Sequence, residues 1–478
     1  MIRKFIRKVL RLAPATARPV LREPAVIPRA RHGIAREAVS QGSARACALL
    51  QDKGYKAYVV GGAVRDLLVG VLPKDFDVAT DATPEEVRGI FKRSRIIGRR
   101  FRIVHVYMGR EIVEITTFRG SEGSAAKTDD HGRLLADNVF GSQAEDAARR
   151  DFTVNALYYD PSTECILDYH HGVADLEQKT LRMIGDPGTR YREDPVRMLR
   201  AVRLSAKLGL FIDPAARRPI RALAPLLENV PQARLLDEML KLLTSGHAVK
   251  CLEALRAEGL HRGILPLLDS IPDHPPGDRF VFLALSDTDE RIRAGKTSSP
   301  AFLFAALLWQ AMCAAWERCK AAGEAPIPAL HLAMTETLSA RDDNIAITRR
   351  IAADIKEIWM LQPRLEQRAG KRPYGTLTHP RFRAGYDFLC LRARAGEVDA
   401  ELPDWWRRFQ EANSSQRAEM LLPETAPKRK RRKRKTKSHP ADPADGDLPR
   451  SNPAYPADGD LPRSNPAGNG FPPSSSGE

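Results

Sequence analysis

Cysteine is scarce in this 478-residue sequence and is never closely paired. The six cysteines are scattered, and no two of them form a Cys-x-x-Cys pair. Structural zinc sites and disulfide frameworks both depend on such spacings, so neither is indicated, and a reducing compartment, the cytoplasm, is expected. No apolar run approaches the ~20 residues that a membrane-spanning helix needs, so integral membrane association is not expected. A P-loop is missing too, because Glu290 stands where the loop ending at Gly295-Lys296-Thr297 would need glycine.

Acidic residues are in deficit, and the deficit is uneven. The sequence has 76 Lys and Arg against 60 Asp and Glu, a formal net charge of +16, which favours a polyanionic partner. Residues 428–437 hold nine basic residues and no acid, leaving only +7 for the rest. We expect RNA phosphate contact from the unbroken basic run of Lys428, Arg429, Lys430, Arg431, Arg432, Lys433, Arg434 and Lys435.

Both ends of the chain differ from its middle. Residues 1–35 are basic with Glu23 as the only acid, and they fit a helix that touches RNA or a membrane surface, an organellar transit peptide, or a solvated extension. Residues 427–478 combine the basic run with a Pro/Asp/Ser-rich 13-residue repeat. Such a composition cannot bury a core, so a disordered tail is predicted.

A glycine turn follows the first clear strand pattern. Tyr58 to Val60 is a short apolar run that stops at Gly61-Gly62, and residues 63–68 have a helical pattern. A strand, a glycine turn and a helix start in succession let backbone N–H groups approach an anion. Arg65 is placed to add a positive charge, so the turn predicts a phosphate-binding site.

Two aspartates lie a few residues beyond this turn. Period-two alternation puts Asp75 and Asp77 on one face of an extended segment and directs Phe76 and Val78 into the core. Two carboxylates that close repel each other unless a proton or a cation lies between them. Oxygen-rich sites that keep positions open for substrate phosphates suit Mg²⁺. The alternative is a pair of solvated turn aspartates, and the nearby glycine turn favours the metal site.

A β-hairpin with a mid-strand acid comes next. Residues 96–106 and 111–118 are rich in β-forming residues and are joined at Gly109. Glu114 shares a strand face with Ile112, and a charge among apolar neighbours is costly unless it is paired. Glu114 is therefore a candidate third acid beside the aspartate pair. A solvated glutamate on an edge strand is the other interpretation.

Two later segments carry arginine beside acid. Arg149 and Arg150 suit a triphosphate, because guanidinium groups bind phosphate through two parallel hydrogen bonds; a surface ion-pair cluster is the alternative. Pro195 fits the first position of a helix, and Arg197, Arg200 and Arg203 share one flank of it, where ordinary ion pairs would also place them. From about residue 215 to 425 the pattern is helical, and arginines near Phe382 and Tyr386 suit either an RNA track or a charged helix face; these are Arg381, Arg383, Arg392 and Arg394.

Together these motifs resemble the nucleotidyltransferase superfamily of polymerase-β-like enzymes, and more narrowly its branch of bacterial poly(A) polymerases and CCA-adding enzymes. The matching segments are Gly-Gly-x-Val-Arg-Asp at 61–66, Asp-x-Asp at 75–77 and Arg-Arg-Asp-x-x-x-Asn-Ala at 149–156. The resemblance implies that Asp151 belongs to the active site, with Asn155 supporting the same pocket. It also implies that Asp194 and Arg197, with Glu193 beside them, read the edge of the nucleotide base.

The resemblance implies an α+β fold. A mixed-sheet catalytic head (36–187) would follow the basic extension (1–35). A helical neck (188–246) and a helical, arginine-rich body (247–426) would come next, before the tail (427–478).

The run from Ile96 to His105 resembles poly(A) polymerases more than CCA-adding enzymes. The expected activity is ATP-dependent, template-independent AMP addition to RNA 3′ ends with two Mg²⁺ ions, by a monomer with possible RNA-decay partners. CCA addition to tRNA is the alternative within the class, and a non-catalytic RNA-binding protein is the alternative outside it.

Overall fold

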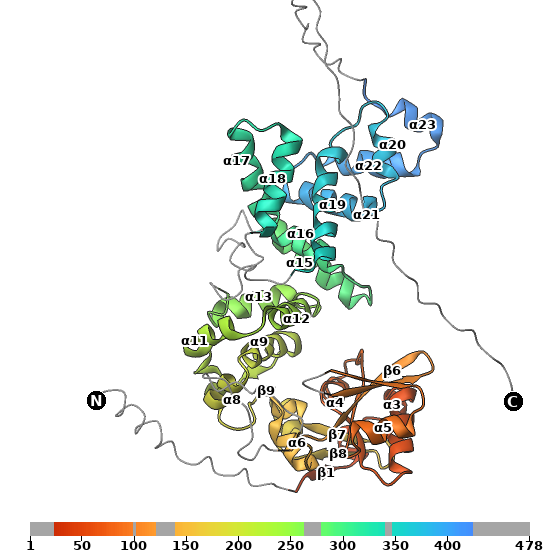
Figure 1. The fold of residues 1–478 in the computed structure, drawn as a ribbon, viewed down its shortest axis with the longest axis vertical. Coiled ribbons are helices and arrows are strands. Elements are labelled where there is room, and N and C mark those ends of the chain that lie inside the picture. Colours follow the sequence, from red (N-terminus) through yellow and green to blue (C-terminus); the bar gives the residue numbers. More distant parts are fainter. Residues whose placement is uncertain (1–22, 99–101, 121–138, 262–278, 340–346, 424–478) are drawn as a thin grey trace, which may run out of the picture. The chain divides into compact units, whose positions relative to one another are not determined.

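An eight-stranded mixed sheet forms the N-terminal part of the fold (Figure 1). The computed structural model describes residues 23–98, 102–120, 139–261, 279–339 and 347–423. Residues 1–22 of the basic extension, for which three interpretations were open, and the basic run 428–435 therefore lie outside the described residues. By contacts the chain divides into residues 1–424 and 425–478. The strand order is β1-β8-β7-β2-β3-β6-β5-β4, with β1 (Ala25–Ile27), β2 (Ala57–Val60), β3 (Asp77–Thr80), β4 (Ser94–Ile97), β5 (Ile103–Met108), β6 (Glu111–Thr117), β7 (Leu157–Asp160) and β8 (Cys165–Asp168).

Neighbouring strands of this sheet pair antiparallel, except that β3 and β6 run parallel, with Val78 opposite Ile115. One sheet face packs against α3 (Gln41–Gln51) and α5 (Pro84–Ile90) (Figure 1). The alternation of apolar and polar residues along the strands explains this, because every second side chain points into the same core. On the other face, α6 (Gln143–Arg149) contributes to a smaller cluster around Phe118 and Tyr158.

The predicted hairpin is correct in its turn and wrong in its first strand. Gly109 has φ +67° and joins β5 to β6 as expected. The β-rich run 96–106 is not one strand, because it contains the end of β4 and most of β5, which pair antiparallel with each other. The reason is visible at Gly98, whose φ of +83° ends β4.

The rest of the described chain is helical, apart from the strand pair β9 (Thr180–Leu181) and β10 (Phe211–Ile212), so the predicted α+β class is confirmed. Short helices α2 (Arg29–His32), α4 (Gly62–Leu68) and α7 (Gly172–Glu177) belong to the sheet region. The helical region comprises α8 (Pro187–Glu193), α9 (Val196–Leu208), α10 (Pro214–Arg217), α11 (Ile220–Leu223), α12 (Gln232–Leu243), α13 (Ala248–Ala257), α15 (Arg279–Arg293), α16 (Pro300–Leu307), α17 (Trp309–Ala321), α18 (Pro326–Ser339), α19 (Arg349–Leu365), α20 (Arg372–Leu377), α21 (Phe382–Ala395), α22 (Glu401–Glu411) and α23 (Ser414–Glu419).

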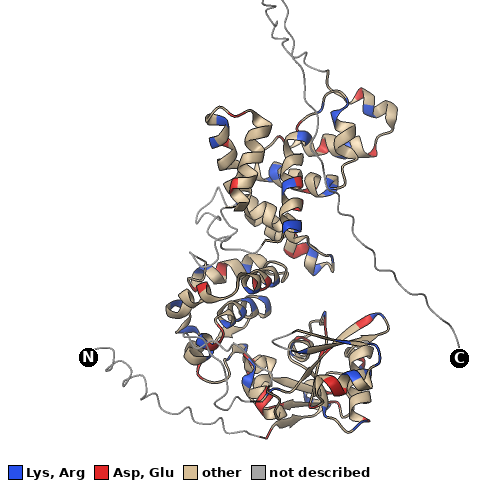
Figure 2. Ribbon diagram, in the orientation of Figure 1, with Lys and Arg blue, Asp and Glu red and all other residues tan. Residues whose placement is uncertain are grey.

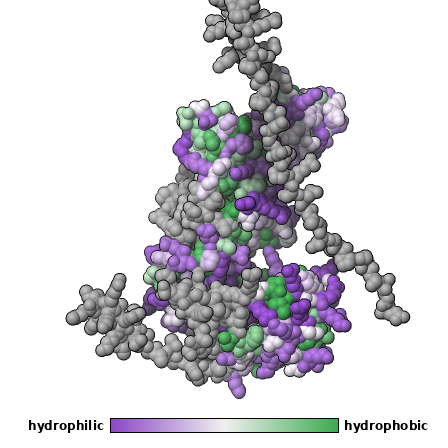
Figure 3. Space-filling model, in the orientation of Figure 1, coloured by the Kyte–Doolittle hydropathy of each residue, from purple (hydrophilic) through white to green (hydrophobic). Residues whose placement is uncertain are grey.

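Within the described ranges, no single helix is long and apolar enough to cross a membrane. The pair α16 and α17, bent by 55° at the break between them, satisfies the length and composition test when taken together. Most hydrophobic side chains are buried, and on the face shown in Figure 3 the hydrophobic residues lie in small patches among hydrophilic ones.

The arginines of α21 and of its N-cap lie in ion pairs rather than along an open track. Figure 2 shows acidic and basic residues interspersed through this helical region. The four arginines that the sequence singled out bind carboxylates: Arg381 binds Asp354 and Glu357, Arg383 binds Asp387, Arg392 binds Glu366 and Glu397, and Arg394 binds Asp287. A charged helix face therefore accounts for these four residues.

Candidate active site

A cavity of about 640 Å³ lies over the open face of the sheet, lined by the glycine turn, β3, β6, residues 146–155 and helices α8, α9 and α12. Its volume falls in the range typical of small-molecule sites. Most candidate residues from the sequence line this cavity, namely Gly61, Gly62, Arg65, Asp77, Glu114, Arg149, Arg150, Asp151, Asn155, Glu193, Asp194, Arg197 and Arg200. Asp75 is not among the lining residues, and Lys428 to Lys435 lie outside the described residues.

The glycine turn has the predicted form, and Gly61 cannot be replaced there without strain. β2 ends at Val60, and α4 begins at Gly62. Gly61 has φ +73° and ψ −124°, a region that other residues avoid. A Cβ at this position would stand 3.1 Å from the Nη1 atom of Arg150. The turn thus brings its backbone close to a guanidinium group at the edge of the cavity.

Arg65 lies at this turn as predicted, but it is buried and already paired. Its side chain donates to Asp66 Oδ1 (2.8 Å from Nε) and to Asn155 Oδ1. The second oxygen of Asp66 accepts from Lys207 Nζ of α9 at 3.2 Å. One carboxylate therefore joins the glycine turn to α9.

Asp77 and Glu114 are neighbours across the parallel β3–β6 pair. Val78 lies opposite Ile115, so the preceding residues, Asp77 and Glu114, both face the cavity. Desolvation first, and then the charge of Glu114, raise the pKa of Asp77 to about 6; Arg150 opposes this rise and Asp75 adds to it. Asp77 is open to the cavity on one side, but the protein around it is crowded enough to disfavour its charged form.

Glu114 lies on an interior strand, which removes the edge-strand alternative, since β6 is flanked by β3 and β5. It is directly opposite His105 on β5, with His105 Nε2 3.2 Å from Glu114 Oε1. The alternation of β6 is clear, because Val113 and Ile115 are buried while Glu114 is exposed on the other face. The predicted placement of Glu114 near Asp77 is thus present in the fold.

The donor set at this point fits Mg²⁺ in chemistry. Among the described residues, no three His, Cys, Asp or Glu side chains are already grouped to hold a metal. Asp77 and Glu114 nevertheless present carboxylate oxygens to an open cavity, and Asp75 lies close enough to raise the pKa of Asp77 further. Mg²⁺ is commonly bound by one or two carboxylates, with water and substrate phosphates completing its shell. These residues would supply the protein's share of such a site.

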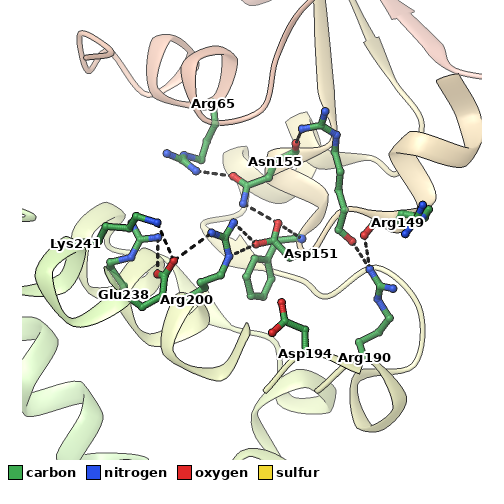
Figure 4. A network of polar contacts seen from close by, with 12 residues as sticks. Arg65, Arg149, Asp151, Asn155, Arg190, Asp194, Arg200, Glu238 and Lys241 are labelled. Carbon is green, nitrogen blue, oxygen red and sulfur yellow. Dashed lines mark hydrogen bonds and ion pairs between the residues drawn. The ribbon is translucent and has the colours of Figure 1, made fainter. Parts of the chain in front are cut away.

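Asp151 lies in the cavity wall, but its oxygens are engaged. Oδ2 accepts from Arg200 Nε at 2.7 Å, and Oδ1 accepts from Asn155 Nδ2 and the Phe152 amide (Figure 4). Burial alone would raise the pKa of Asp151, but Arg200 and these hydrogen bonds hold it well below its ordinary range. Asp151 is thus a permanent anion that orients Arg200.

The two arginines before Asp151 have different surroundings. Arg150 donates to Tyr158 Oη at 3.1 Å and to Asp146 Oδ2, and its guanidinium lies 5.1 Å from the centre of the Tyr158 ring. Arg149 Nη1 donates to the Gly120 carbonyl at 2.6 Å. Both still line the cavity, so each can present positive charge there without being free to move.

The junction between α8 and α9 leaves one carboxylate oxygen unpaired. Glu193 accepts from Arg190 (2.7 Å) and Arg197 (3.0 Å). Asp194 Oδ2 accepts from Arg234 Nη2 at 2.6 Å, whereas Asp194 Oδ1 is buried and has no hydrogen-bond partner among the described residues. The predicted helix does begin near Pro195, which is the N-cap of α9. A buried acceptor without a donor requires an explanation, and Asp194 is one of the residues that line the cavity.

Five charged lining residues were not identified as site residues from the sequence: Arg119, Asp146, Arg203, Arg234 and Glu238. Glu238 on α12 is buried and accepts from Arg203 at 3.4 Å and Lys241 at 3.1 Å, and lies 3.8 Å from Arg200 (Figure 4). An available signal was the spacing of Arg234 and Glu238, which puts both on one face of an amphipathic helix. Nothing in that spacing shows that the face meets α9.

Comparison with known proteins identifies relatives along the length of the chain. Three family models match in succession: "Poly A polymerase head domain" at residues 57–182, "Probable RNA and SrmB-binding site of polymerase A" at 209–271, and "Polymerase A arginine-rich C-terminus" at 322–439. Poly(A) polymerase I of Haemophilus influenzae is 45% identical over 407 residues, which cover 83% of this chain and 90% of the relative.

CCA-adding enzymes are similar over a smaller part. The CCA-adding enzyme of Bacillus licheniformis is 36% identical over 220 residues, 46% of this chain and 54% of that enzyme. Among solved structures, the CCA-adding enzyme of Bacillus stearothermophilus in complex with CTP matches with a TM-score of 0.55 and 25% identity, covering 78% of this chain and 82% of that one.

Proposed function

Because this chain belongs to the poly(A) polymerase family of polynucleotide adenylyltransferases, we propose that its cavity transfers AMP from ATP to RNA 3′ ends without a template. The observation that carries the proposal is one cavity that contains both the adjacent carboxylates of Asp77 and Glu114 and the unpaired buried oxygen of Asp194. The two carboxylates suit the reacting phosphate, and the unpaired oxygen of Asp194 suits a nucleobase.

The triphosphate would lie between the glycine turn and the arginines. Gly61 and Gly62 allow close approach of the backbone, and Arg149 and Arg150 line the same cavity. Arg65 contributes its charge from a buried position, where its pairing with Asp66 and Asn155 fixes the start of α4. Cationic side chains that are already held in place bind phosphate without rearranging, and they stabilise the negative charge that develops on it during the reaction.

The base would lie against the junction of α8 and α9. An adenine amino group is a donor and would satisfy Asp194 Oδ1, while Arg197 stands one helical turn further along. Arg234 holds the other oxygen of Asp194, so the free oxygen has a fixed direction. Protein side chains would thus select the nucleotide in place of a template.

The carboxylates would hold two Mg²⁺ ions, with Asp75 and Asp77 as ligands and Glu114 as the third acid. We favour Glu114 over Asp151 in that role, because both oxygens of Asp151 are already bound. Asp75, Asp77 and Glu114 would hold Mg²⁺, whose charge would favour loss of the proton from the RNA 3′-hydroxyl and would offset the charge of the pyrophosphate. The 3′-oxygen, its proton released to solvent, would form a bond to the α-phosphorus as the bond from that phosphorus to the oxygen bridging to the β-phosphate breaks, and pyrophosphate would leave.

Poly(A) synthesis is favoured over CCA addition by the extent of the similarity. The poly(A) polymerase match spans 83% of the chain, whereas the CCA-adding match spans 46%. The segment from Ile96 to His105 supports the same choice. A non-catalytic RNA-binding role is disfavoured, because adjacent carboxylates and an orphaned buried oxygen are costly features for an idle cavity.

The activity is tested by giving the purified full chain an RNA oligonucleotide, Mg²⁺ and either ATP or CTP. We expect long A tails with ATP alone and at most marginal extension with CTP alone. Addition of only one or two C residues before A would identify a CCA-adding enzyme. Absence of incorporation with either nucleotide, in a preparation that binds RNA, would favour the non-catalytic alternative.

We also propose how the enzyme contacts RNA and in which process it acts. Lys428 to Lys435 would contact RNA phosphates, and tail synthesis by a monomer would support RNA decay with protein partners. The family model over 209–271 is named for RNA and SrmB, which supports RNA and protein partners for this region. Truncation after residue 427 should weaken RNA binding more at low salt than at high salt.

A further inference from the structure

We propose that the open face of strands β4, β5 and β6 holds the 3′-terminal segment of the RNA, through Arg95, Tyr107 and Ile112. The inference rests on the proposed function and goes further by placing the second substrate. These three residues lie on the sheet face that carries Glu114, outside the cavity lining.

The pairing register fixes which side chains share this face. Arg95 lies opposite His105, and His105 lies opposite Glu114, so they form one row across three strands. Tyr107 lies opposite Ile112 in the next row of the same face. Directly opposite residues in an antiparallel pair project to the same side, and residues two apart along a strand do so as well.

The surface is solvent-exposed and chemically mixed. Tyr107 is 39% exposed and Ile112 is 53% exposed, although the alternate residues Val106 and Val113 are buried on the core face. Arg95 is exposed and forms no ion pair with any part of the chain that the structure describes. An aromatic ring, an aliphatic side chain and an unpaired arginine together are typical of surfaces that bind single-stranded nucleic acid.

The strand order points to RNA as the occupant. In the strand order, Asn155 lies just before β7, Gly61 directly follows β2, Asp77 begins β3 and Glu114 lies on β6. The carboxylates therefore lie between the proposed ATP wall and the β5–β6 hairpin. An attacking 3′-oxygen has to reach the carboxylates from a side that ATP leaves open, and the hairpin provides one.

The spacing along the strands suits a nucleotide. Tyr107 and Ile112 are two residues from His105 and Glu114, about 7 Å at the usual strand rise. A terminal nucleotide whose 3′-oxygen lies near Glu114 would place its base or its 5′ neighbour over the Tyr107–Ile112 row. Arg95, at the sheet edge, would then meet a phosphate.

The hairpin is anchored, so the face is preformed. Glu111, at the start of β6, accepts from the Ser40 hydroxyl and from the Gly42 amide (3.1 Å) at the beginning of α3. A Cβ on Gly42 would stand 2.3 Å from Glu111 Oε2, which shows how closely the two elements meet. A rigid platform loses little conformational entropy when it binds a flexible strand.

The test is steady-state kinetics of full-length Tyr107→Ser and Ile112→Ser proteins with a short oligo(A) primer, varying primer and ATP separately. Loss of one stacking contact should raise the primer KM about fivefold or more, with the ATP KM within about twofold of wild type. Tyr107→Phe should restore the wild-type value. The matched control is Val26→Ser, which changes a strand residue 62% exposed at the other edge of the sheet.

A second measurement separates this inference from the proposed activity. Equilibrium binding of a fluorescent RNA, without ATP or Mg²⁺, should weaken in the same variants, and Arg95→Ala should reduce the slope of log affinity against log salt by about 0.7. Arg88→Ala, on α5 across the core, should leave that slope unchanged. If the wild-type protein incorporates no nucleotide but the three variants still weaken RNA binding as described, the proposed activity is wrong and the RNA-binding face stands.

Unchanged primer KM and unchanged RNA binding in Tyr107→Ser, Ile112→Ser and Arg95→Ala would overturn the platform. A rise in the ATP KM equal to the rise in the primer KM would also overturn it. So would variants that change the oligomeric state of the protein and leave its RNA binding unchanged. If a Tyr107 variant melts at a lower temperature, the salt slope of the exposed Arg95→Ala variant decides.

Discussion

Asp151 and Arg200 join the sheet region to the helical region through one ion pair, with Arg200 Nε 2.7 Å from Asp151 Oδ2. Asp151 follows α6, while Arg200 lies in the middle of α9. The pair has further support, because Asn155 donates to Asp151 and Glu238 lies 3.8 Å from Arg200. The cavity therefore has a wall whose two halves are held together by charge.

Asp151→Asn should destabilise the protein by about 2–4 kcal/mol and sharply reduce activity, because it leaves the charge of Arg200 without its main partner. Urea unfolding of Asp151→Asn, Arg200→Met and the double variant measures this. We expect the double variant to lose clearly less than the sum of the single losses. Additive losses would show that the two groups act independently.

Asp75→Asn, Asp77→Asn and Glu114→Gln should each reduce AMP incorporation by at least about 100-fold, because each would remove a ligand oxygen charge at the reacting phosphate. RNA affinity should stay near the wild-type value. Asp52→Asn, an exposed acid at the end of α3, is the matched control. Extension near the wild-type rate by an Asp77 variant would remove the metal assignment.

The pKa of Asp77, raised to about 6, predicts a specific pH dependence of stability without Mg²⁺. Between pH 4 and 6 the folded protein keeps a proton on Asp77 that the unfolded chain has released, so this group's contribution to stability falls as pH rises through that window. The effect should be modest, since the side chain is open to solvent and salt screens it.

Asp77→Asn should remove that loss. The free energy of unfolding, measured in urea at pH 5 and at pH 7, should change less between the two pH values in the variant. Added Mg²⁺ should stabilise the wild type at pH 7 and have little effect on the variant. The same pH difference in both proteins would contradict the assignment.

Gly61→Ala should cost about 1–3 kcal/mol of stability and most of the activity, because a side chain at φ +73° and ψ −124° is strained and would press on Arg150. The control is Gly209→Ala at the C-cap of α9. That residue has φ +65° and ψ +31°, and a Cβ there would meet no atom within 4 Å. It should lose only about 1 kcal/mol and keep its activity. If Gly61→Ala and Gly209→Ala lose equal stability and activity, the glycine turn accepts a side chain at position 61 without strain.

Asp194→Ala should relax nucleotide choice. ATP and CTP carry an amino donor where GTP and UTP carry a carbonyl acceptor, so a carboxylate oxygen discriminates against the second pair. We expect the ratio of kcat/KM for ATP to that for GTP to fall about tenfold or more. Asp237→Ala, on the exposed side of α12, should leave the ratio unchanged. An unchanged ratio in Asp194→Ala would place base recognition elsewhere.

Local patterns predicted the parts of the site that depend on neighbouring residues. The strand before Gly61, the alternation around Glu114 and the helix start at Pro195 are all properties of a few consecutive residues. The partners of Arg65 were not predictable in this way, because Asn155 is 90 positions away and Lys207 binds the same Asp66 from α9. Glu238 enters the cavity only because α12 packs against α9, and no spacing within α12 shows that. The boundaries of head, neck and body remain predictions.

The carboxylate of Asp66, which binds both Arg65 and Lys207, has a consequence for the length of nucleotide that the site accepts. Oδ1 binds the arginine of the glycine turn, and Oδ2 binds Lys207 on the helix whose first turn follows Asp194. Moving the turn and that helix apart would strip a buried anion of one of its cations. The distance between the proposed phosphate-binding turn and the proposed base-binding residues would therefore be fixed before a nucleotide binds.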